Sequence, residues 1–300
     1  MEQIWDCIVI AGLSAALNLR RRGRTVLVLS GGAPLLEKAE LVDNYLGMPG
    51  VTGKEMMERF RAHAAAQGAV LKAQRAGNVM PMGDTFLVGA GSDMYTSRAV
   101  ILACGVSKAG YVPGEAEYLG RGVSYCATCD GMLYRGKTVV VVGGGNSAAE
   151  DALFLSRVCK KVYLVHRGAV LTASKSYWTA LQKAENVEFI WNSRVVELLY
   201  GSVVTGVVLE GVESGNRSEL ACDGVFIAVG RIPNTGLFHG VLEMDAAGYL
   251  IADETTRTAL PGVFAVGDVR TKPLRQIITA AADGAVASKY AEAYLAEQED

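Results

Sequence analysis

The sequence predicts an α/β protein with two Rossmann-like nucleotide-binding domains, one of them split into two segments of the chain. Runs of β-branched residues alternate with helical stretches, which is typical of parallel sheets covered by helices. Strand–helix–strand units occur at 7–30 and 138–168. The tail from Tyr249 adds an apolar strand and a glycine–Asp turn, so we expect it to complete the sheet of the first unit. The second domain is then an insertion into the first.

The composition argues against several classes of function. Half of the 300 residues are hydrophobic, yet no apolar run reaches the roughly 18 residues that a membrane span needs. The net charge is −2 and the basic residues are scattered, which offers no face for nucleic acid. The beginning, MEQIWD, does not have the pattern of a secretory signal. We therefore expect a soluble, cytoplasmic protein that binds neither membranes nor nucleic acids.

The two strand–helix–strand units can be aligned with each other. Their helices and second strands match at an offset of 136 residues, for example Ser14 with Glu150, whereas their first strands match at 132, Cys7 with Val139. The difference, 136 − 132 = 4, corresponds to 143–146 of the second unit, which have no counterpart between Ile10 and Ala11. The first unit therefore lacks the glycine-rich turn that a nucleotide-binding unit needs.

The second unit keeps such a turn. Gly143-x-Gly145-x-x-Ala148 follows a strand and opens a helix, so its backbone can approach a pyrophosphate at the helix N-terminus. A tight structural turn is the alternative. The following strand ends without an acidic partner for a ribose 2′-hydroxyl, and a cation there suits a 2′-phosphate. The residues expected around a dinucleotide are Gly143, Gly145, Asn146, Ser147, Ala148, His166 and Arg167.

Cys126 and Cys129, in the segment SYCATCDG, are the strongest chemical signal. Two thiols at this spacing can close a small disulfide, and a nearby helix start stabilises a thiolate. The alternatives are plain core cysteines or half of a zinc site, but no second ligand pair occurs among three histidines, so we expect no metal. Asp130 can move a proton if burial raises its pKa, or it can cap a helix. We expect the remaining cysteines to pack as small hydrophobes: Cys7, Cys104, Cys159 and Cys222.

Thiol exchange needs an electron source. A flavin can accept a hydride or single electrons and pass a pair to a disulfide. Gly267 and Asp268 follow the strand GVFAV, where the Asp can accept hydrogen bonds from sugar hydroxyls. A surface turn is the alternative at this position.

Together these residues resemble the low-molecular-weight thioredoxin reductases over nearly the whole chain. The segments that carry the resemblance are SYCATCDG, GGGNSAAEDA, GRIPNT, FAVGDVR and LRQIITAAADGAVAS. The resemblance implies a homodimeric flavoprotein whose FAD-binding domain comprises 1–112 and 239–300. It also implies an inserted NAD(P)H-type domain, 113–238, that carries the cysteine pair.

The same resemblance implies roles for individual residues. Cys129 faces the flavin, Cys126 attacks the disulfide of thioredoxin, and Asp130 serves as acid. The residues implied in FAD binding are Gly12, Asn44, the turn Ala103-Cys104-Gly105, Gly267, Asp268, Gln276 and Ile277.

The chain departs from the family at the nucleotide domain. The family reads His-Arg-Arg with a further Arg four positions on, which clamps the 2′-phosphate of NADPH. Here Arg167 is kept, but Gly168 and Thr172 occupy the other two places, a loss of roughly 1.5 to 3 kcal/mol for each cation. The segment LLEKAELVDNYLGMPG looks like the ferredoxin-dependent flavin thioredoxin reductases, a branch without pyridine nucleotide. The donor expected is NADPH or reduced ferredoxin.

The second departure is the missing turn. The family's first strand runs into Gly-x-Gly-Pro before the Ala-Gly kept here as Ala11 and Gly12, so this comparison also counts four missing residues. The first helix, the Asp268 turn and the segment RQIITAAADG are still those of an FAD site. This favours four unrecorded residues or a recent local deletion over a family that evolved without the turn. If Ile10 and Ala11 are joined directly, we expect a distorted pyrophosphate site.

The leading function is a flavin-dependent disulfide oxidoreductase that reduces thioredoxin. Electrons pass from the donor to FAD, then to Cys126 and Cys129, and then to thioredoxin. A flavin oxidase or peroxiredoxin-linked reductase on the same scaffold is a second enzyme hypothesis. The missing turn motivates a third, a cofactor-poor relative that acts as a redox-sensing or partner-binding module.

Overall fold

The computed structural model describes residues 3–32, 34–108, 110–238 and 240–299, and it divides into two compact units. Unit 1 comprises Met1–Glu37, Gly53–Ser107 and Ile232–Asp300, and unit 2 comprises Lys38–Thr52 and Lys108–Arg231. Each unit is described by itself below.

Unit 1 is built on a sheet with the strand order β3-β2-β1-β6-β5-β4, in which β17 also pairs with β6. The strands β1, β2, β3, β6 and β17 run parallel, whereas β4, β5 and β6 form an antiparallel meander. Their bounds are β1 (Ile4–Ile10), β2 (Val26–Leu29), β3 (Val70–Lys72), β4 (Ala76–Met82), β5 (Thr85–Ala90), β6 (Asp93–Leu102) and β17 (Val263–Ala265). Because β17 comes from the tail, the prediction that the tail completes the first sheet is confirmed.

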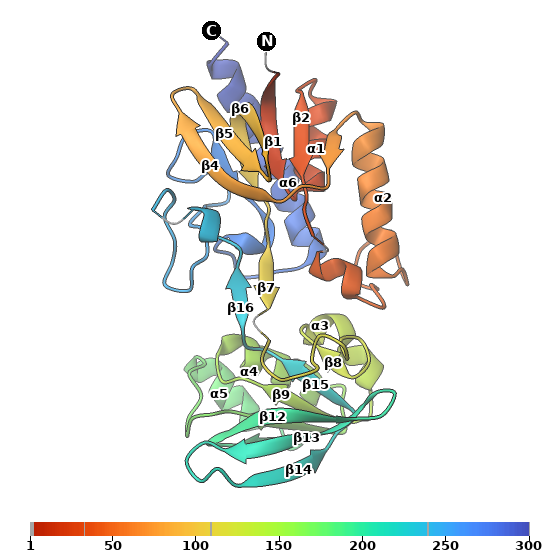
Figure 1. The fold of residues 1–300 in the computed structure, drawn as a ribbon. Coiled ribbons are helices and arrows are strands. Elements are labelled where there is room, and N and C mark those ends of the chain that lie inside the picture. Colours follow the sequence, from red (N-terminus) through yellow and green to blue (C-terminus); the bar gives the residue numbers. More distant parts are fainter. Residues whose placement is uncertain (1–2, 33, 109, 239, 300) are drawn as a thin grey trace. The chain divides into compact units, whose positions relative to one another are not determined.

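Helices pack on one face of this sheet, where α1 and α6 lie side by side (Figure 1). The side chains of β1 alternate, as a strand requires. Cys7 and Val9 pack with α1 and α6, whereas Ile8 and Ile10 pack with apolar residues of β4 and β5. The helical elements of unit 1 are α1 (Leu13–Arg21), α2 (Gly53–Ala66), α6 (Ile277–Glu297), η1 (Leu35–Lys38), η3 (Gly236–Phe238) and η4 (Gly267–Val269).

Unit 2 combines a parallel sheet with an antiparallel one. The parallel sheet has the order β11-β10-β9-β15-β8, and the antiparallel sheet has the order β12-β13-β14. The strands are β8 (Val123–Ser124), β9 (Thr138–Val142), β10 (Lys161–Val165), β11 (Val187–Ile190), β12 (Ser193–Tyr200), β13 (Val204–Gly211), β14 (Arg217–Ala221) and β15 (Gly224–Ile227). The helical elements are α3 (Ala127–Asp130), η2 (Gly131–Tyr134), α4 (Asn146–Ser156) and α5 (Lys175–Leu181).

The larger segment of unit 2, Lys108–Arg231, begins and ends at two short strands that pair with each other. The chain enters this segment through β7 (Val106–Lys108) and leaves it through β16 (Arg231–Pro233) (Figure 1). The two ends of this segment therefore lie side by side, and the shorter segment Lys38–Thr52 joins unit 2 separately.

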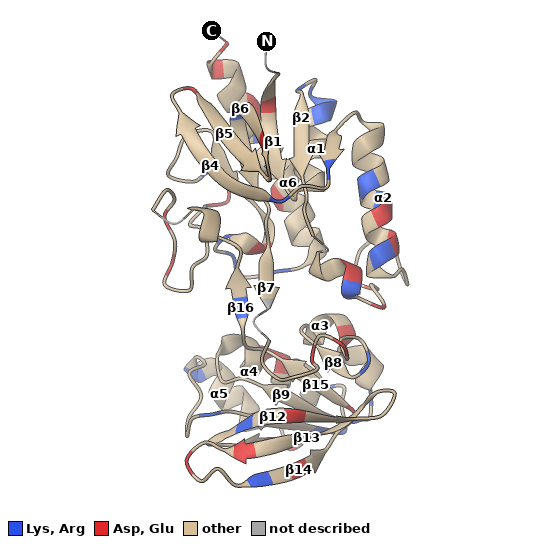
Figure 2. Ribbon diagram, in the orientation of Figure 1, with Lys and Arg blue, Asp and Glu red and all other residues tan. Residues whose placement is uncertain are grey.

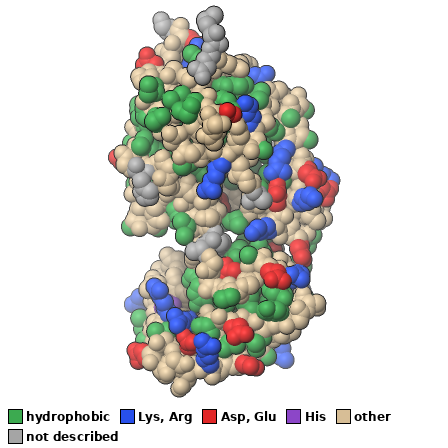
Figure 3. Space-filling model, viewed as in Figure 1, with side chains coloured by type: hydrophobic (Ala, Val, Ile, Leu, Met, Phe, Trp, Pro, Cys, Tyr) green, Lys and Arg blue, Asp and Glu red, His purple; other side chains and the backbone are tan. Residues whose placement is uncertain are grey.

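Charge is mixed over both units. Lys and Arg lie among Asp and Glu along the ribbon (Figure 2), and the face drawn in Figure 3 carries both signs without a field of one kind. In the described part of the chain, no helix is both long and apolar enough to cross a membrane. Nor do three or more His, Cys, Asp or Glu side chains there group in a way that would hold a metal ion.

Candidate active site

Cys126 and Cys129 form a disulfide at the start of α3, with their Cα atoms 5.3 Å apart. Cys126 is the N-cap residue of that helix and is half-buried, whereas Cys129 is exposed. The disulfide that the redox interpretation of this pair requires is therefore present in the structure. The other four cysteines are free, and each packs in a hydrophobic cluster as predicted: Cys7, Cys104, Cys159 and Cys222.

Asp130 follows the disulfide and is bound to the strand that precedes it. Ser124 Oγ donates a 2.6 Å hydrogen bond to Asp130 Oδ2 and accepts one of 3.1 Å from the backbone N–H of Cys126. Burial raises the pKa of Asp130, the Ser124 hydrogen bond lowers it, and the negative charge of Glu40 raises it further. The Asp130 side chain makes no cap hydrogen bond to η2. A carboxyl group that tends to hold its proton thus lies next to the cysteine pair.

In unit 1, several residues predicted to bind FAD lie close to the ends of the parallel strands β1, β6 and β17. The Ala103 N–H donates to Ile10 O at 2.9 Å, and a Cβ on Gly12 would lie 2.9 Å from Ala103 Cβ. Gly267 begins η4 one residue after β17, and a Cβ there would lie 3.3 Å from Ala280 near the start of α6. Ligands of open α/β sheets bind at this carboxyl edge.

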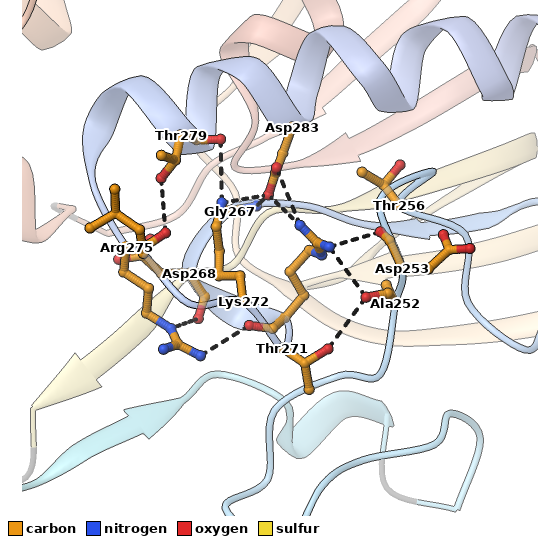
Figure 4. A network of polar contacts seen from close by, with 12 residues as sticks. Ala252, Asp253, Thr256, Gly267, Asp268, Thr271, Lys272, Arg275, Thr279 and Asp283 are labelled. Atoms are coloured by element: carbon orange, nitrogen blue, oxygen red, sulfur yellow. Dashed lines mark hydrogen bonds and ion pairs between the residues drawn. The ribbon is translucent and has the colours of Figure 1, made fainter. Parts of the chain in front are cut away.

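Asp283 of α6 fixes the Gly267–Asp268 turn (Figure 4). Its Oδ2 accepts hydrogen bonds of 2.8 Å from the Gly267 N–H and 2.8 Å from Lys272 Nζ, and it pairs with Arg270 Nη1 at 3.2 Å. Arg270 is 3% exposed and also donates to the carbonyl oxygen atoms of 252 and 253. The buried Arg270 and the partly buried Lys272 thus neutralise the partly buried carboxylate of Asp283, which is the condition for keeping charge inside a fold.

The second glycine-rich turn lies between β9 and α4. Gly143 has φ 146°, and a Cβ on it would lie 2.7 Å from Ala148 Cβ, so this residue closes the strand against the helix. The His166 ring lies against Gly144. Only Gly145 has space, because a Cβ there would lie 3.9 Å from Thr172 Oγ1. The turn has the close approach of strand and helix that a pyrophosphate site requires.

The side chains beyond β10 are not the set of cations that would bind the 2′-phosphate of NADPH. Thr172 donates to Gly144 O through its N–H at 2.8 Å and its Oγ1 at 3.1 Å, so its hydroxyl is directed at the turn. Burial lowers the pKa of His166, the hydrogen bond that its ring donates to the Val170 backbone raises it, and the charge of Arg167 lowers it, so the ring is neutral at pH 7. Arg167, which is exposed, is the remaining predicted cation.

Comparison with known proteins agrees with this geometry. The family described as "Pyridine nucleotide-disulphide oxidoreductase" matches residues 9–284. A thioredoxin reductase of Treponema pallidum is 39% identical over 306 residues, covering 98% of each chain. The chain belongs to the thioredoxin reductases. It is therefore an oxidoreductase of that family.

Solved thioredoxin reductases share its fold. The enzyme from Streptococcus pyogenes has a TM-score of 0.91 at 35% identity, covering 99% of this chain and all of that one. A ferredoxin-flavin thioredoxin reductase from Clostridium acetobutylicum has a TM-score of 0.55 at 30% identity, covering 99% of each chain. The prediction of two Rossmann-like domains, one inserted into the other, is confirmed by these relatives and by the sheets described above.

Thioredoxin reductases are FAD-dependent and use NADPH, and the carboxyl edge of unit 1 fits an FAD. Gly105 has φ 63° with open space where a Cβ would be, so a ligand can approach its backbone. Helix α6 begins with Gln276, whose backbone N–H and side chain form a capping box with Thr279. The turn after β1 is the exception, because Ala11 follows Ile10 directly and has φ 64°. The junction therefore contains a left-handed alanine, and a distorted pyrophosphate site there stays a prediction.

One residue predicted to bind FAD belongs to a different unit from the others. Asn44 is exposed in Lys38–Thr52, which packs with unit 2, whereas the other residues predicted for FAD belong to unit 1. The sequence did not identify Ser124 or Asp283 as site residues. A lone Asp in the alanine-rich stretch of α6 was the available signal for Asp283, and nothing in the segment VSYC marks Ser124 as a partner of Asp130.

Proposed function

We propose that this protein reduces the disulfide of thioredoxin with the Cys126–Cys129 pair. The observation that carries the proposal is this disulfide, beside a buried carboxyl, in a chain of the thioredoxin reductase family. In the reduced pair, the Cys126 thiolate attacks one sulfur of thioredoxin and forms a mixed disulfide. Cys129 then attacks Cys126, which restores the internal disulfide and releases thioredoxin as a dithiol. Two electrons and two protons pass from the pair to thioredoxin.

Single cysteine variants test these roles. In Cys129→Ser, Cys126 can still form the mixed disulfide with thioredoxin, but no second thiol is present to break it. A covalent complex with thioredoxin therefore accumulates. Cys126→Ser should accumulate none, and Cys159→Ser, which changes a buried thiol outside the pair, should turn over normally. Non-reducing electrophoresis and intact mass measure the complex. Trapping by Cys126→Ser alone would exchange the two roles, and trapping by neither would reject the proposal.

Asp130 is the proposed acid. Burial raises its pKa, which favours uptake of a proton, and the group lies where it can deliver a proton to the thiolate that forms when the disulfide opens. Asp130→Asn should lower the turnover of thioredoxin by about 100-fold or more, the usual contribution of a positioned acid. Ser124→Ala is the matched variant, because it removes the hydrogen bond to Asp130 and keeps the carboxyl group. A normal rate in Asp130→Asn would remove this role.

The proposed FAD site is the carboxyl edge of unit 1. The residues that would hold the group are Gly12, Ala103, Gly105, Gly267, Asp268, Gln276 and Ile277, all of unit 1. Asn44, which the resemblance also implies, belongs to unit 2. Bound FAD supplies the electron pair that reduces the disulfide. The domain assignment of 1–112 with 239–300 to FAD, and of 113–238 to the inserted domain, is part of this proposal.

Reduced ferredoxin is the proposed donor, in preference to NADPH. The support is the side of unit 2 beyond β10, where the Thr172 hydroxyl is bound to Gly144 and His166 is neutral. A 2′-phosphate is held by cations, usually Arg. Gly143, Gly145, Asn146, Ser147 and Ala148 keep the turn for a pyrophosphate, so weak binding of NADH or NADPH is expected there. A ferredoxin-flavin thioredoxin reductase of Clostridium acetobutylicum aligns over 99% of this chain, so the scaffold is compatible with this donor.

Thioredoxin reduction measured with each donor separates these possibilities. Reduced ferredoxin should support turnover, whereas NADPH and NADH should do so only at high concentration and with similar KM. Thr172→Arg should improve the KM for NADPH and leave that for NADH unchanged. Rapid bleaching of the flavin by micromolar NADPH in the natural protein would reject ferredoxin as the required donor.

A homodimer and a cytoplasmic location complete the proposal. The homodimer comes from the resemblance to thioredoxin reductases, and light scattering on the purified protein tests it. Fractionation of the source cells tests the location.

The β1–α1 junction favours a second candidate function, a redox-sensing module that binds little FAD. The left-handed Ala11 is the observation behind it. A purified protein that stays colourless when given FAD would support this candidate, and a yellow protein with about one flavin per chain would reject it.

A further inference from the structure

Tyr125, directly before Cys126, is held at both its side chain and its backbone. Its hydroxyl donates a 2.8 Å hydrogen bond to Glu115 Oε1, and its carbonyl oxygen accepts a 3.1 Å hydrogen bond from Arg231 Nη2. All of these residues belong to unit 2. The residue that leads into the disulfide is therefore fixed from two directions.

Glu115 connects Tyr125 to the point where the chain enters unit 2. It is only 4% exposed, and its Oε2 accepts the backbone N–H groups of Tyr111 at 2.7 Å and Val112 at 2.9 Å. A buried carboxylate with three donors is well satisfied and costly to displace. Burial raises the pKa of Tyr125, and the carboxylate of Glu115 raises it further, so the hydroxyl remains a donor over the physiological pH range.

Arg231 connects Tyr125 to the point where the chain leaves the unit. It is the first residue of β16, the strand that pairs with β7. The segment after β7 thus reaches the Tyr125 hydroxyl through Glu115, and β16 reaches the Tyr125 carbonyl through Arg231. Both ends of the segment Lys108–Arg231 are thus linked to Tyr125, the residue before Cys126.

We infer that Tyr125 is a positioning residue that couples the entry and exit of unit 2 to the redox pair. With Glu115 and Arg231 it holds Cys126 where its sulfur reaches Cys129, which raises the effective concentration of one thiol for the other. The inference rests on one part of the proposed function, namely that the Cys126–Cys129 pair cycles between disulfide and dithiol. It makes no use of thioredoxin, FAD or the donor.

The equilibrium with glutathione measures this effective concentration. Glutathione disulfide oxidises the dithiol: Cys126 forms a mixed disulfide and releases one glutathione, and Cys129 displaces the second, so two electrons and two protons end on two glutathione thiols. The full chain is equilibrated in glutathione buffers of graded ratio, quenched by alkylation and weighed by mass spectrometry.

Tyr125→Phe removes the hydroxyl and keeps the ring. We expect it to lower the effective concentration about three- to tenfold, the effect of one lost hydrogen bond. Arg231→Met should lower it by a similar factor. Because both act through Tyr125, the double variant should show less than the product of the two effects. The control is Tyr200→Phe, which changes an exposed tyrosine of the same unit and should leave the equilibrium unchanged.

Equal effective concentrations in the natural protein, Tyr125→Phe and Arg231→Met would overturn the inference, as would an equal loss in Tyr200→Phe. If Tyr125→Phe does not fold, Arg231→Met decides the question alone. A protein that shows the expected loss but never reduces thioredoxin would count against the proposed function and leave this inference standing.

Discussion

The two strand–helix junctions of this thioredoxin reductase differ although the units that contain them align closely. Between β9 and α4 lie three glycines, 143–145, whereas only Ala11 and Gly12 lie between β1 and α1. Both junctions continue the ladder in the same way, since the Gly143 N–H donates to Val165 O and the Ala11 N–H donates to Leu29 O, each at 3.0 Å. The strands are thus equivalent up to their last residue.

The four missing residues can be located from the helices. Leu13, where α1 begins, corresponds to position 149 (13 + 136), but α4 begins at Asn146, three residues earlier. Counted by elements, the turn of the first unit is one residue shorter and its helix begins three residues later, whereas the sequence alignment places the gap opposite 143–146. The first helical turn provides the N–H groups that bind a phosphate. The phosphate-binding part of the first unit is therefore shorter, and its core is in place.

The largest effect on stability is expected in the longer junction. Gly143→Ala places a side chain at φ 146°, 2.7 Å from Ala148 Cβ, and should lower the free energy of unfolding of unit 2 by about 3 kcal/mol. Urea unfolding followed by the fluorescence of Trp178 and Trp191 measures this change. An unchanged midpoint would mean that the glycine is not needed for the closure of strand on helix.

A smaller loss is expected for Gly12→Ala in the shorter junction. The new Cβ would lie 2.9 Å from Ala103 Cβ and 2.9 Å from Val9 Cγ1, with no unusual φ involved. Overpacking of this kind costs about 1 to 3 kcal/mol. The unfolding midpoint of unit 1, followed by Trp5, should decrease, and a midpoint equal to that of the natural protein would show that α1 can move away from β6.

Ala11→Gly should have the opposite sign. A left-handed alanine costs about 1 to 2 kcal/mol, and the greater freedom of an unfolded glycine cancels part of the gain, so we expect a stabilisation of about 0.5 to 1 kcal/mol. Differential scanning calorimetry of the two proteins measures it. A destabilised Ala11→Gly variant would show that the junction carries no backbone strain.

The smallest effect is expected for Gly145→Ala, which is the matched control for Gly143→Ala. Its φ of −87° suits any residue, and the new Cβ would lie 3.9 Å from the nearest side chain. The free energy of unfolding should therefore change by less than about 0.5 kcal/mol. A large loss would contradict the account of Gly145 as the open position of the turn.

Much of the fold could be predicted from the sequence because local patterns determine it. The run VVVV at 139–142 has the β-branched residues of a buried parallel strand, and GVFAV from 262 adds the strand that the tail contributes. The spacing of Cys126 and Cys129 allowed a disulfide, which is present. In each case the deciding residues are neighbours in the chain.

The rest could not be predicted because it depends on residues far apart in the chain. Arg231 and Tyr125 are 106 positions apart, and no periodic pattern connects them. Lys38–Thr52 packs with unit 2, although the residues before and after it in the sequence belong to unit 1. The location of Asn44 could therefore not be predicted from the sequence. The sequence shows that Thr172 stands where the family has an Arg, but it does not show that the Thr172 hydroxyl donates a hydrogen bond to Gly144 O.

The central claim is that the β1–α1 junction is the weak part of an otherwise complete FAD site. The most direct test is FAD affinity, measured by flavin fluorescence during titration of the natural protein and of a variant with Gly-Ser-Gly-Pro inserted between Ile10 and Ala11. The insertion restores one turn residue and three helical residues, and it should tighten FAD binding at least about tenfold, or 1.4 kcal/mol. Equal or weaker binding by the insertion variant would contradict the claim.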